Sequence, residues 1–227
     1  MKKFGFIMKT AALAVTAAVA LAGCQPLQSP SGGAQANKSS YVKIQKRLMG
    51  LQTYRSFVTL ESNSNKGSDT YEMIQQCKIN GEYRVEVTAP ASVAGFVTVN
   101  DGKSVRQFNQ TLQDKLVVFP DTDPAREHVR NEMLITSFIK NYLDSDEVSV
   151  SVADFGEGNC TVLEASIPGK PGIPNSNTHF VKEKLWIDNK TLDPVQLIVY
   201  DDHDIEQMIL TYKTFEYNIE LADSVFQ

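Results

Sequence analysis

The sequence predicts an α+β domain in which one antiparallel β-sheet is covered on one face by two helices. Many short segments alternate apolar and polar residues, which is the pattern of half-buried strands. Clusters of Gly, Asn, Asp and Pro separate these segments, as turns separate the strands of an antiparallel sheet. Two other segments place apolar residues at steps of three and four, which is helical spacing.

The first half of the domain is predicted to be a helix followed by strands. Ile44, Leu48 and Leu51 lie on one face of a helix over 41–51. The Asn80-Gly81 pair between two strands favours a tight hairpin. The expected strands are Thr53–Glu61, Thr70–Ile79, Tyr83–Val87, Phe96–Val99, Val105–Asn109 and Leu116–Phe119.

The second half is predicted to be a helix followed by a meander of strands. The helix covers Arg126–Leu143, and its apolar stripe includes Met133, Phe138 and Tyr142. A last extended piece runs from Tyr217 to Phe226. The expected strands are Val148–Val152, Thr161–Ile167, Phe180–Ile187, Pro194–Tyr200 and Ile205–Phe215.

Residues 1–23 have the features of a lipoprotein signal peptide. A basic start is followed by an uncharged, mostly apolar segment that ends in small residues. This segment is shorter than the ~20 apolar residues that a membrane span needs. The tetrad Leu21–Cys24 resembles a bacterial lipobox, which implies cleavage before Cys24 and acylation of that residue with chains such as palmitate. We therefore expect a lipid-anchored protein on the extracytoplasmic face of the cell membrane.

Residues 24–39 are predicted to be the lipidated cysteine and a flexible tether, and 40–227 a single domain. Pro, Gly, Ser and Gln dominate the tether, which has no apolar period. Without its first 23 residues the chain has 204, enough for one domain with a sizeable core. It then has 19 basic and 27 acidic side chains, a net charge of −8, and no basic patch, so we expect no nucleic-acid partner.

The domain contains two further cysteines, Cys77 and Cys160. An even pair outside the cytoplasm is compatible with a disulfide. Buried free thiols are also common, and geometry decides between the two. The sequence leaves both alternatives open.

The sequence shows no arrangement of catalytic residues. It contains no Gly-X-Ser-X-Gly elbow, P-loop, His-Glu-X-X-His or Cys-X-X-Cys motif, so we expect no enzyme activity, metal or cofactor. Asp201–Asp204 is the one dense group of potential metal ligands. Because Asp tolerates turn geometry and adjacent strand residues point in opposite directions, a solvated turn is the favoured interpretation.

The order of short motifs over residues 41–227 resembles the LolA/LolB lipoprotein-carrier superfamily. An amphipathic helix is followed by a long hairpin, the strand Tyr83–Val87 and an Asn-Asp-Gly turn before the second helix. The later motifs are Lys184–Asp188, Leu192–Pro194, Val199–Asp201 and Leu221–Phe226. Within this superfamily, the Ser-Asn-Lys-Gly hairpin and the Lys-Glu-Lys-Leu-Trp-Ile-Asp strand are most similar to the GerS germination lipoprotein family.

The resemblance implies an unclosed half-barrel, that is, a curved antiparallel sheet whose concave face is closed by helices. In the carriers, the space between sheet and helices takes acyl chains. The GerS family implies instead a non-catalytic lipoprotein of spore formation and germination. Such a protein binds a CwlD-like cell-wall amidase that modifies cortex peptidoglycan. A lipoprotein or lipid carrier with a hydrophobic cavity is the alternative function.

Six large side chains are candidates for the interior of the half-barrel or for a groove in it: Phe96, Phe108, Phe119, Phe138, Tyr142 and Trp186. Trp186 is expected beneath a helix. The size of these side chains favours a mostly filled interior. Binding would then use an outer surface or a sheet edge, where an unpaired strand can accept a partner or a second copy of the chain.

Overall fold

The computed structural model describes residues 31–64, 67–110, 117–120, 131–145, 149–167 and 180–227. From Gly32 to Gln227 the chain forms one compact unit. Its helical elements are α1 (Ser31–Met49), the 3₁₀ turn η1 (Asn131–Met133), α3 (Ile135–Asp144) and the 3₁₀ turn η2 (Asp223–Phe226). Its strands are β1 (Thr53–Ser64), β2 (Gly67–Lys78), β3 (Tyr83–Ala89), β4 (Phe96–Asn100), β5 (Ser104–Asn109), β6 (Val117–Pro120), β7 (Ser149–Phe155), β8 (Gly158–Ser166), β9 (Phe180–Asp188), β10 (Pro194–Asp201) and β11 (Glu206–Tyr217).

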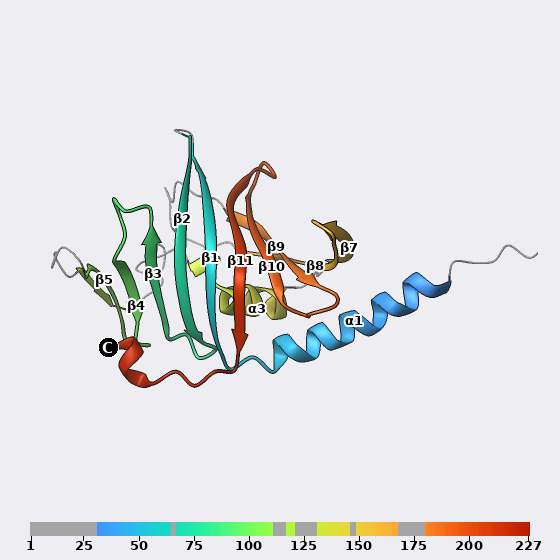
Figure 1. Ribbon diagram of the computed structural model, residues 1–227, viewed down its shortest axis with the longest axis horizontal. Helices are drawn as coiled ribbons and strands as arrows, with labels where there is room; N and C mark the ends of the chain where they lie inside the picture. Colours follow the sequence, from blue (N-terminus) through green and yellow to red (C-terminus); the bar gives the residue numbers. More distant parts are fainter. Residues whose placement is uncertain (1–30, 65–66, 111–116, 121–130, 146–148, 168–179) are drawn as a thin grey trace, which may run out of the picture. The chain divides into compact units, whose positions relative to one another are not determined.

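The strands form one sheet in the order β6-β5-β4-β3-β2-β1-β11-β10-β9-β8-β7 (Figure 1). Each neighbouring pair is antiparallel, and β1 joins the two halves by pairing with β11. Since β6 and β7 stand at opposite ends of this order, the sheet is not closed. The predicted fold class, an α+β domain with an unclosed antiparallel sheet, is confirmed.

The connection between the two edge strands places a helix over one face of the sheet. The chain leaves the sheet at β6, and η1 and α3 precede its return at β7. In Figure 1, α3 lies behind the central part of the sheet. It packs against β8, and the backbone N–H of Ile135 donates to the Tyr54 hydroxyl of β1 at 3.3 Å. The face that α3 covers is called the inner face below.

The main hydrophobic core lies between the inner face and the helices. Alternate residues of the strands point into it, as the period of two in a strand requires. α1 contributes Ile44 and Leu48, and α3 contributes Phe138 and Ile139. Its largest fully buried side chains are Tyr54, Phe138, Ile44, Leu51, Ile135, Leu163, Leu185, Ile187, Leu197, Met208 and Leu210.

A smaller cluster covers part of the outer face of the sheet. Val97 and Val99 of β4 point away from α3, yet both are fully buried. Phe226 of η2 lies over them, and its backbone oxygen accepts a hydrogen bond of 2.7 Å from Arg106. The expected extended piece at the C-terminus is therefore a strap that ends in a 3₁₀ turn, because it packs across the sheet instead of pairing with it.

Both helices differ in extent from their predictions. α1 begins at Ser31, so residues 31–39 of the predicted tether are helical backbone. Apolar periodicity could not indicate this part, because its residues have no apolar face. α3 begins at Ile135 instead of Arg126, and residues 126–130 lie outside the described ones. Leu134 is extended, with φ −105° and ψ 134°, and this interrupts the helical stripe that the sequence predicts through Met133.

Among the described residues, no helix is long and apolar enough to cross a bilayer. Residues 1–30, which include Cys24 and the predicted signal peptide, lie outside the described ones. The lipid anchor and the membrane location therefore stay predictions.

Candidate functional site

The space between α3 and the sheet is filled by aromatic and aliphatic side chains. Phe138 is fully buried there, and its ring stacks on that of Tyr142 with centroids 5.8 Å apart. Tyr54 rises from β1 below and stacks on Phe215 at 4.9 Å. The Tyr142 hydroxyl lies 3.0 Å from that of Tyr41, which links α3 to α1. The filled interior that the sequence favours is thus observed over this central region.

A buried polar network attaches the start of α3 to the sheet. The Tyr54 hydroxyl donates to Oε1 of Gln75 at 3.3 Å, while it accepts the N–H of Ile135. Nε2 of Gln75 donates to the backbone oxygen of Met133 at 3.1 Å. These bonds satisfy backbone groups at a helix end that has no side-chain cap. They fix α3 to β1 and β2 and so oppose its movement away from the sheet.

Glu183 of β9 is a buried carboxyl beneath the middle of α3. It is fully buried, and its Oε1 accepts a hydrogen bond of 2.6 Å from Nδ2 of Asn141. Its Oε2 has no partner among the described residues. Burial raises the pKa of Glu183 to about 8, and the charge of Glu132 also raises it, while the bond from Asn141 lowers it. The carboxyl is therefore mostly protonated at neutral pH.

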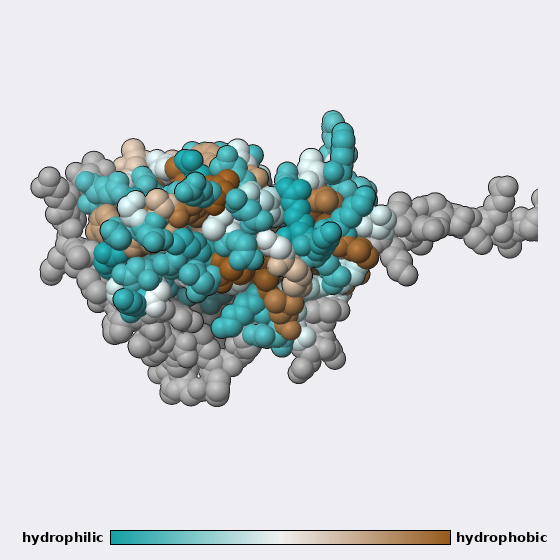
Figure 2. All heavy atoms as spheres, turned by 90° about the horizontal axis from the view of Figure 1, so that it is seen from below, coloured by the Kyte–Doolittle hydropathy of each residue, from teal (hydrophilic) through white to brown (hydrophobic). Residues whose placement is uncertain are grey.

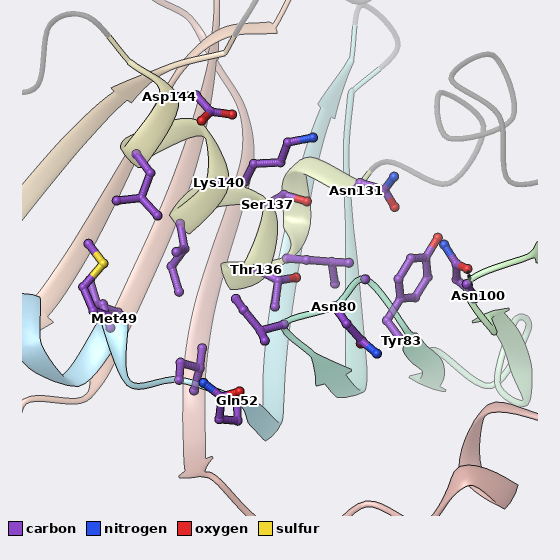
Figure 3. Close-up of a pocket in the computed structure, with 18 residues that line it drawn as sticks. Met49, Gln52, Asn80, Tyr83, Asn100, Asn131, Thr136, Ser137, Lys140 and Asp144 are labelled. Atoms are coloured by element: carbon purple, nitrogen blue, oxygen red, sulfur yellow. Dashed lines mark hydrogen bonds between the residues drawn. The ribbon is translucent and has the colours of Figure 1, made fainter.

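A pocket of about 660 Å³ opens at one end of the same interface (Figure 3). The end of α1 and the exposed side of α3 form one part of its wall. The β2–β3 turn and the first residues of β3 form another part, and the β4–β5 turn a third. Its volume is typical of small-ligand sites. The filled core closes its inner end, since Leu48, Leu51 and Leu134 are buried.

Polar and apolar groups are mixed in this pocket. Figure 3 shows Asn80, Tyr83 and Asn100 on the sheet side and Thr136, Ser137 and Lys140 on α3. Asn100 is buried, and its Oδ1 accepts the N–H of Gly102 at 2.8 Å. The other lining residues are Leu48, Met49, Leu51, Gln52, Ile79, Gly81, Asn131, Leu134, Ile139, Leu143 and Asp144.

The structure brings two of the six predicted interior residues together. Phe138 and Tyr142 lie in the main core as expected. Phe96 is 38% exposed and is not part of the main core. Phe108 is also outside the interior, because it pairs with Val97 across β4 and β5 and shares its outer face. The side chain of Phe119 lies outside the described ones.

Trp186 is not beneath a helix, which corrects the prediction for this residue. Leu185 and Ile187, its neighbours in β9, both point into the main core. Alternation along a strand therefore directs Trp186 to the outer face. There its ring lies 6.2 Å from that of Phe155 in β7.

The two described cysteines are free thiols, and both are buried. Cys77 points into the main core, where burial raises its pKa to about 12. Cys160 has the opposite orientation to its core neighbours Leu163 and Ala165 in β8. The sheet thus separates the two thiols, which decides the alternative that the sequence leaves open.

The acidic cluster after β10 is a hairpin turn. Asp201, Asp202 and His203 offer ligand atoms within 4.8 Å of one another. Oδ1 of Asp201, however, accepts the backbone N–H groups of His203 and Ile205, each at 2.9 Å. The bond from Ile205 is the main reason that the pKa of Asp201 is lowered. This carboxylate stabilises the turn, as the sequence interpretation holds.

Sequence reasoning missed the pocket and the buried polar residues beneath α3. Gln75 lies between Met73 and Cys77, and Glu183 lies two residues before Leu185. Both are polar residues on an otherwise apolar strand face, and this interruption was the available signal. The pocket gave no comparable signal, because its wall combines segments far apart in the sequence.

Solved structures with similar folds come from several bacteria. An uncharacterized conserved protein from Thermus thermophilus is 16% identical with a TM-score of 0.50, over 82% of this chain and 92% of that one. A chain in the structure of the CwlD amidase from Clostridioides difficile with the GerS lipoprotein is 27% identical, with a TM-score of 0.46, over 86% and 100%. A LolA superfamily protein from Nitrosomonas europaea is 15% identical, with a TM-score of 0.42, over 84% and 96%.

The family comparison covers nearly the whole chain. No curated protein matches the sequence significantly. The family described as sporulation protein YdcC-like matches residues 12–226, which include every described strand and helix from Ser31 onward. The chain therefore belongs to the YdcC-like sporulation protein family.

Proposed function

We propose that this chain is a lipid-anchored, non-catalytic binding protein that holds a CwlD-like cell-wall amidase during sporulation or germination. The filled space between α3 and the sheet is the observation that supports it most directly. Phe138, Tyr142 and Tyr54 occupy the volume in which a carrier of this fold would hold an acyl chain. A protein whose interior is filled must bind its partner through surface groups.

The family and the residues support the same proposal. Membership in a sporulation family is consistent with a role in a cell that remodels its peptidoglycan. The hairpin and strand motifs that resemble the GerS family imply a lipoprotein that works through an amidase. Asp201 is engaged in its turn, and Glu183 and Cys77 are buried, so none of these reactive groups meets a substrate in the described structure.

Binding can be tested with the purified chain beginning at Gln25 and a CwlD-like amidase from the same genome. Gel filtration and calorimetry should show a complex, and the chain alone should not hydrolyse peptidoglycan. Amidase activity should change when the chain is added. Failure to form any complex would contradict the proposal.

Lipid transport is the second candidate function, and the open pocket of about 660 Å³ favours it. A fluorescent fatty acid titrated into the delipidated chain distinguishes the two candidates. A non-catalytic binding module should show no saturable binding of the probe. Stoichiometric binding that Ser137→Trp, a substitution in the wall of the pocket, blocks would assign the chain to lipid or lipoprotein transport.

A further inference from the structure

Three exposed apolar side chains surround the pocket between α1, α3 and the β2–β3 turn. Met49 is 47% exposed, Ile79 39% and Leu143 56%, and all three line the pocket. They come from three different elements, so no local sequence pattern explains why they lie together. Seen from below the view of Figure 1, hydrophobic side chains gather in patches on a largely hydrophilic face (Figure 2). Exposed apolar groups around a cavity indicate a binding site.

One polar atom of a residue in the wall of the pocket has no hydrogen-bond partner among the described residues. Oδ1 of Asn131 accepts no hydrogen bond from the described residues. This oxygen is closed off from solvent, so a bound N–H or O–H group reaches it only after the side chain turns into the pocket. The side chains of Gln52, Thr136 and Ser137 line the same space, so further donors and acceptors are available to a ligand.

The charges at the pocket balance each other. Lys140 and Asp144, one basic and one acidic residue, are the ionisable groups of α3 that line it, and both are exposed. The inner wall has amides, hydroxyls and aliphatic groups instead of charges. Such a wall suits an uncharged ligand, since a buried charge needs a partner of opposite sign.

The same chemistry distinguishes a peptide from an acyl chain. A hydrocarbon chain has no donor for Asn131, and it would remove the amide and hydroxyl groups of the wall from water without compensation. An extended peptide segment offers backbone N–H and C=O groups to these side chains. Its apolar side chains can contact Met49, Ile79 and Leu143, which line the same pocket.

We infer that the pocket between α1, α3 and the β2–β3 turn is the docking site for an uncharged, extended segment of the partner protein, inserted through one apolar side chain. This inference rests on the proposed function and names the surface through which the chain holds its partner. Met49, Ile79 and Leu143 form the apolar rim of the pocket. The side chains of Asn131, Thr136 and Ser137 form hydrogen bonds with the backbone of the segment.

The test uses a variant that changes the rim without changing the core. Met49→Gln combined with Leu143→Gln keeps side-chain size, and both positions are exposed. Val42→Gln combined with Ile205→Gln is the matched control, because both side chains are 56% exposed and neither lines the pocket. Calorimetry measures the affinity of each variant for the CwlD-like amidase. Loss of a central apolar contact should weaken binding about tenfold or more in the rim variant and leave the control unchanged.

A cross-linking measurement locates the partner directly. A chain with benzoylphenylalanine in place of Leu143 is irradiated with the amidase, and the same residue replaces Ile205 in the control. Mass spectrometry should identify one uncharged segment of the amidase attached at position 143 and none at position 205. The fluorescent fatty acid is tested on the rim variant in parallel and should not bind the wild type.

The outcomes separate this inference from the proposed function. If the wild type binds the amidase and the rim variant binds equally well, the docking site is wrong and the proposed function stands. If the wild type does not bind the amidase, both fail. If the fatty acid binds the wild type and the rim variant loses it, the occupant is an acyl chain and the inference is overturned.

Discussion

Replacement of Glu183 by Gln should make the protein more stable near neutral pH, although it removes an ionisable group from the core. Glu183 is fully buried, and only Oε1 has a hydrogen-bond partner among the described residues, Nδ2 of Asn141. A Gln side chain has the same shape as the protonated carboxyl. Its oxygen can still accept from Asn141, so the substitution imitates the neutral form.

The size of the effect follows from the pKa of Glu183, which burial raises from 4.5 to about 8. A raised carboxyl pKa means that the folded state prefers the protonated form. The contribution of the protonated Glu183 to the free energy of unfolding is fully present below pH 4.5. It is lost as the pH rises through 8. Each pH unit in this window costs about 1.4 kcal/mol. At pH 7 the wild type has therefore lost about 3 kcal/mol that Glu183→Gln retains.

Urea unfolding of both proteins at several pH values between 5 and 8 tests this prediction. The difference in unfolding free energy should grow steadily in favour of Glu183→Gln as the pH rises. Glu164→Gln is the control, because Glu164 lies outside the core on the partly exposed outer face, where it pairs with Lys184 at 3.1 Å. A stability difference for Glu183→Gln that does not vary with pH would refute the argument that this carboxyl is neutral in the fold.

Three further predictions concern the anchor, the core and the acidic turn. Cys24→Ala should abolish partitioning into detergent and labelling by radioactive palmitate, whereas a membrane-bound, processed variant would contradict lipidation. Phe138→Ala should lower the unfolding free energy by about 3–5 kcal/mol, because the filled interior cannot collapse around the cavity; a loss under 1 kcal/mol in urea unfolding would argue against a filled interior. Asp201→Ala should lower the unfolding free energy by about 1–2 kcal/mol, because the hydrogen bonds to the N–H groups of the turn are lost. His203→Ala should change the unfolding free energy by under ~0.5 kcal/mol. Divalent metals should raise the melting temperature of neither variant.

Local patterns in the sequence were sufficient to find most elements of the fold. The Asn80-Gly81 turn was predictable because a tight hairpin needs positive φ, and Gly81 has a φ of 105°. The strands β3 and β9 were found because one residue in two is buried where they face the core. The structure extends or shortens most strands by a few residues, since alternation weakens where a strand leaves the core.

The helices were harder to bound, because their ends depend on contacts from elsewhere. α3 begins at Ile135 since Leu134 is extended and the Tyr54 hydroxyl accepts the first N–H. That partner lies 81 residues earlier in the chain, and periodicity within residues 126–143 cannot reveal it. Apolar spacing therefore did not show that helical structure is interrupted at Leu134.

The sequence alone determined the fold class and the type of most elements, because alternation and turn chemistry are properties of neighbouring residues. It did not determine which face of the sheet the helices cover. Trp186 and Phe108 were assigned to the interior for their size, yet the strand period directs both to the outer face. The pairing of β1 with β11, the burial of Glu183 and the pocket at the end of α3 were decided by tertiary structure alone. Each joins residues distant in the chain, and only the packed sheet brings them into contact.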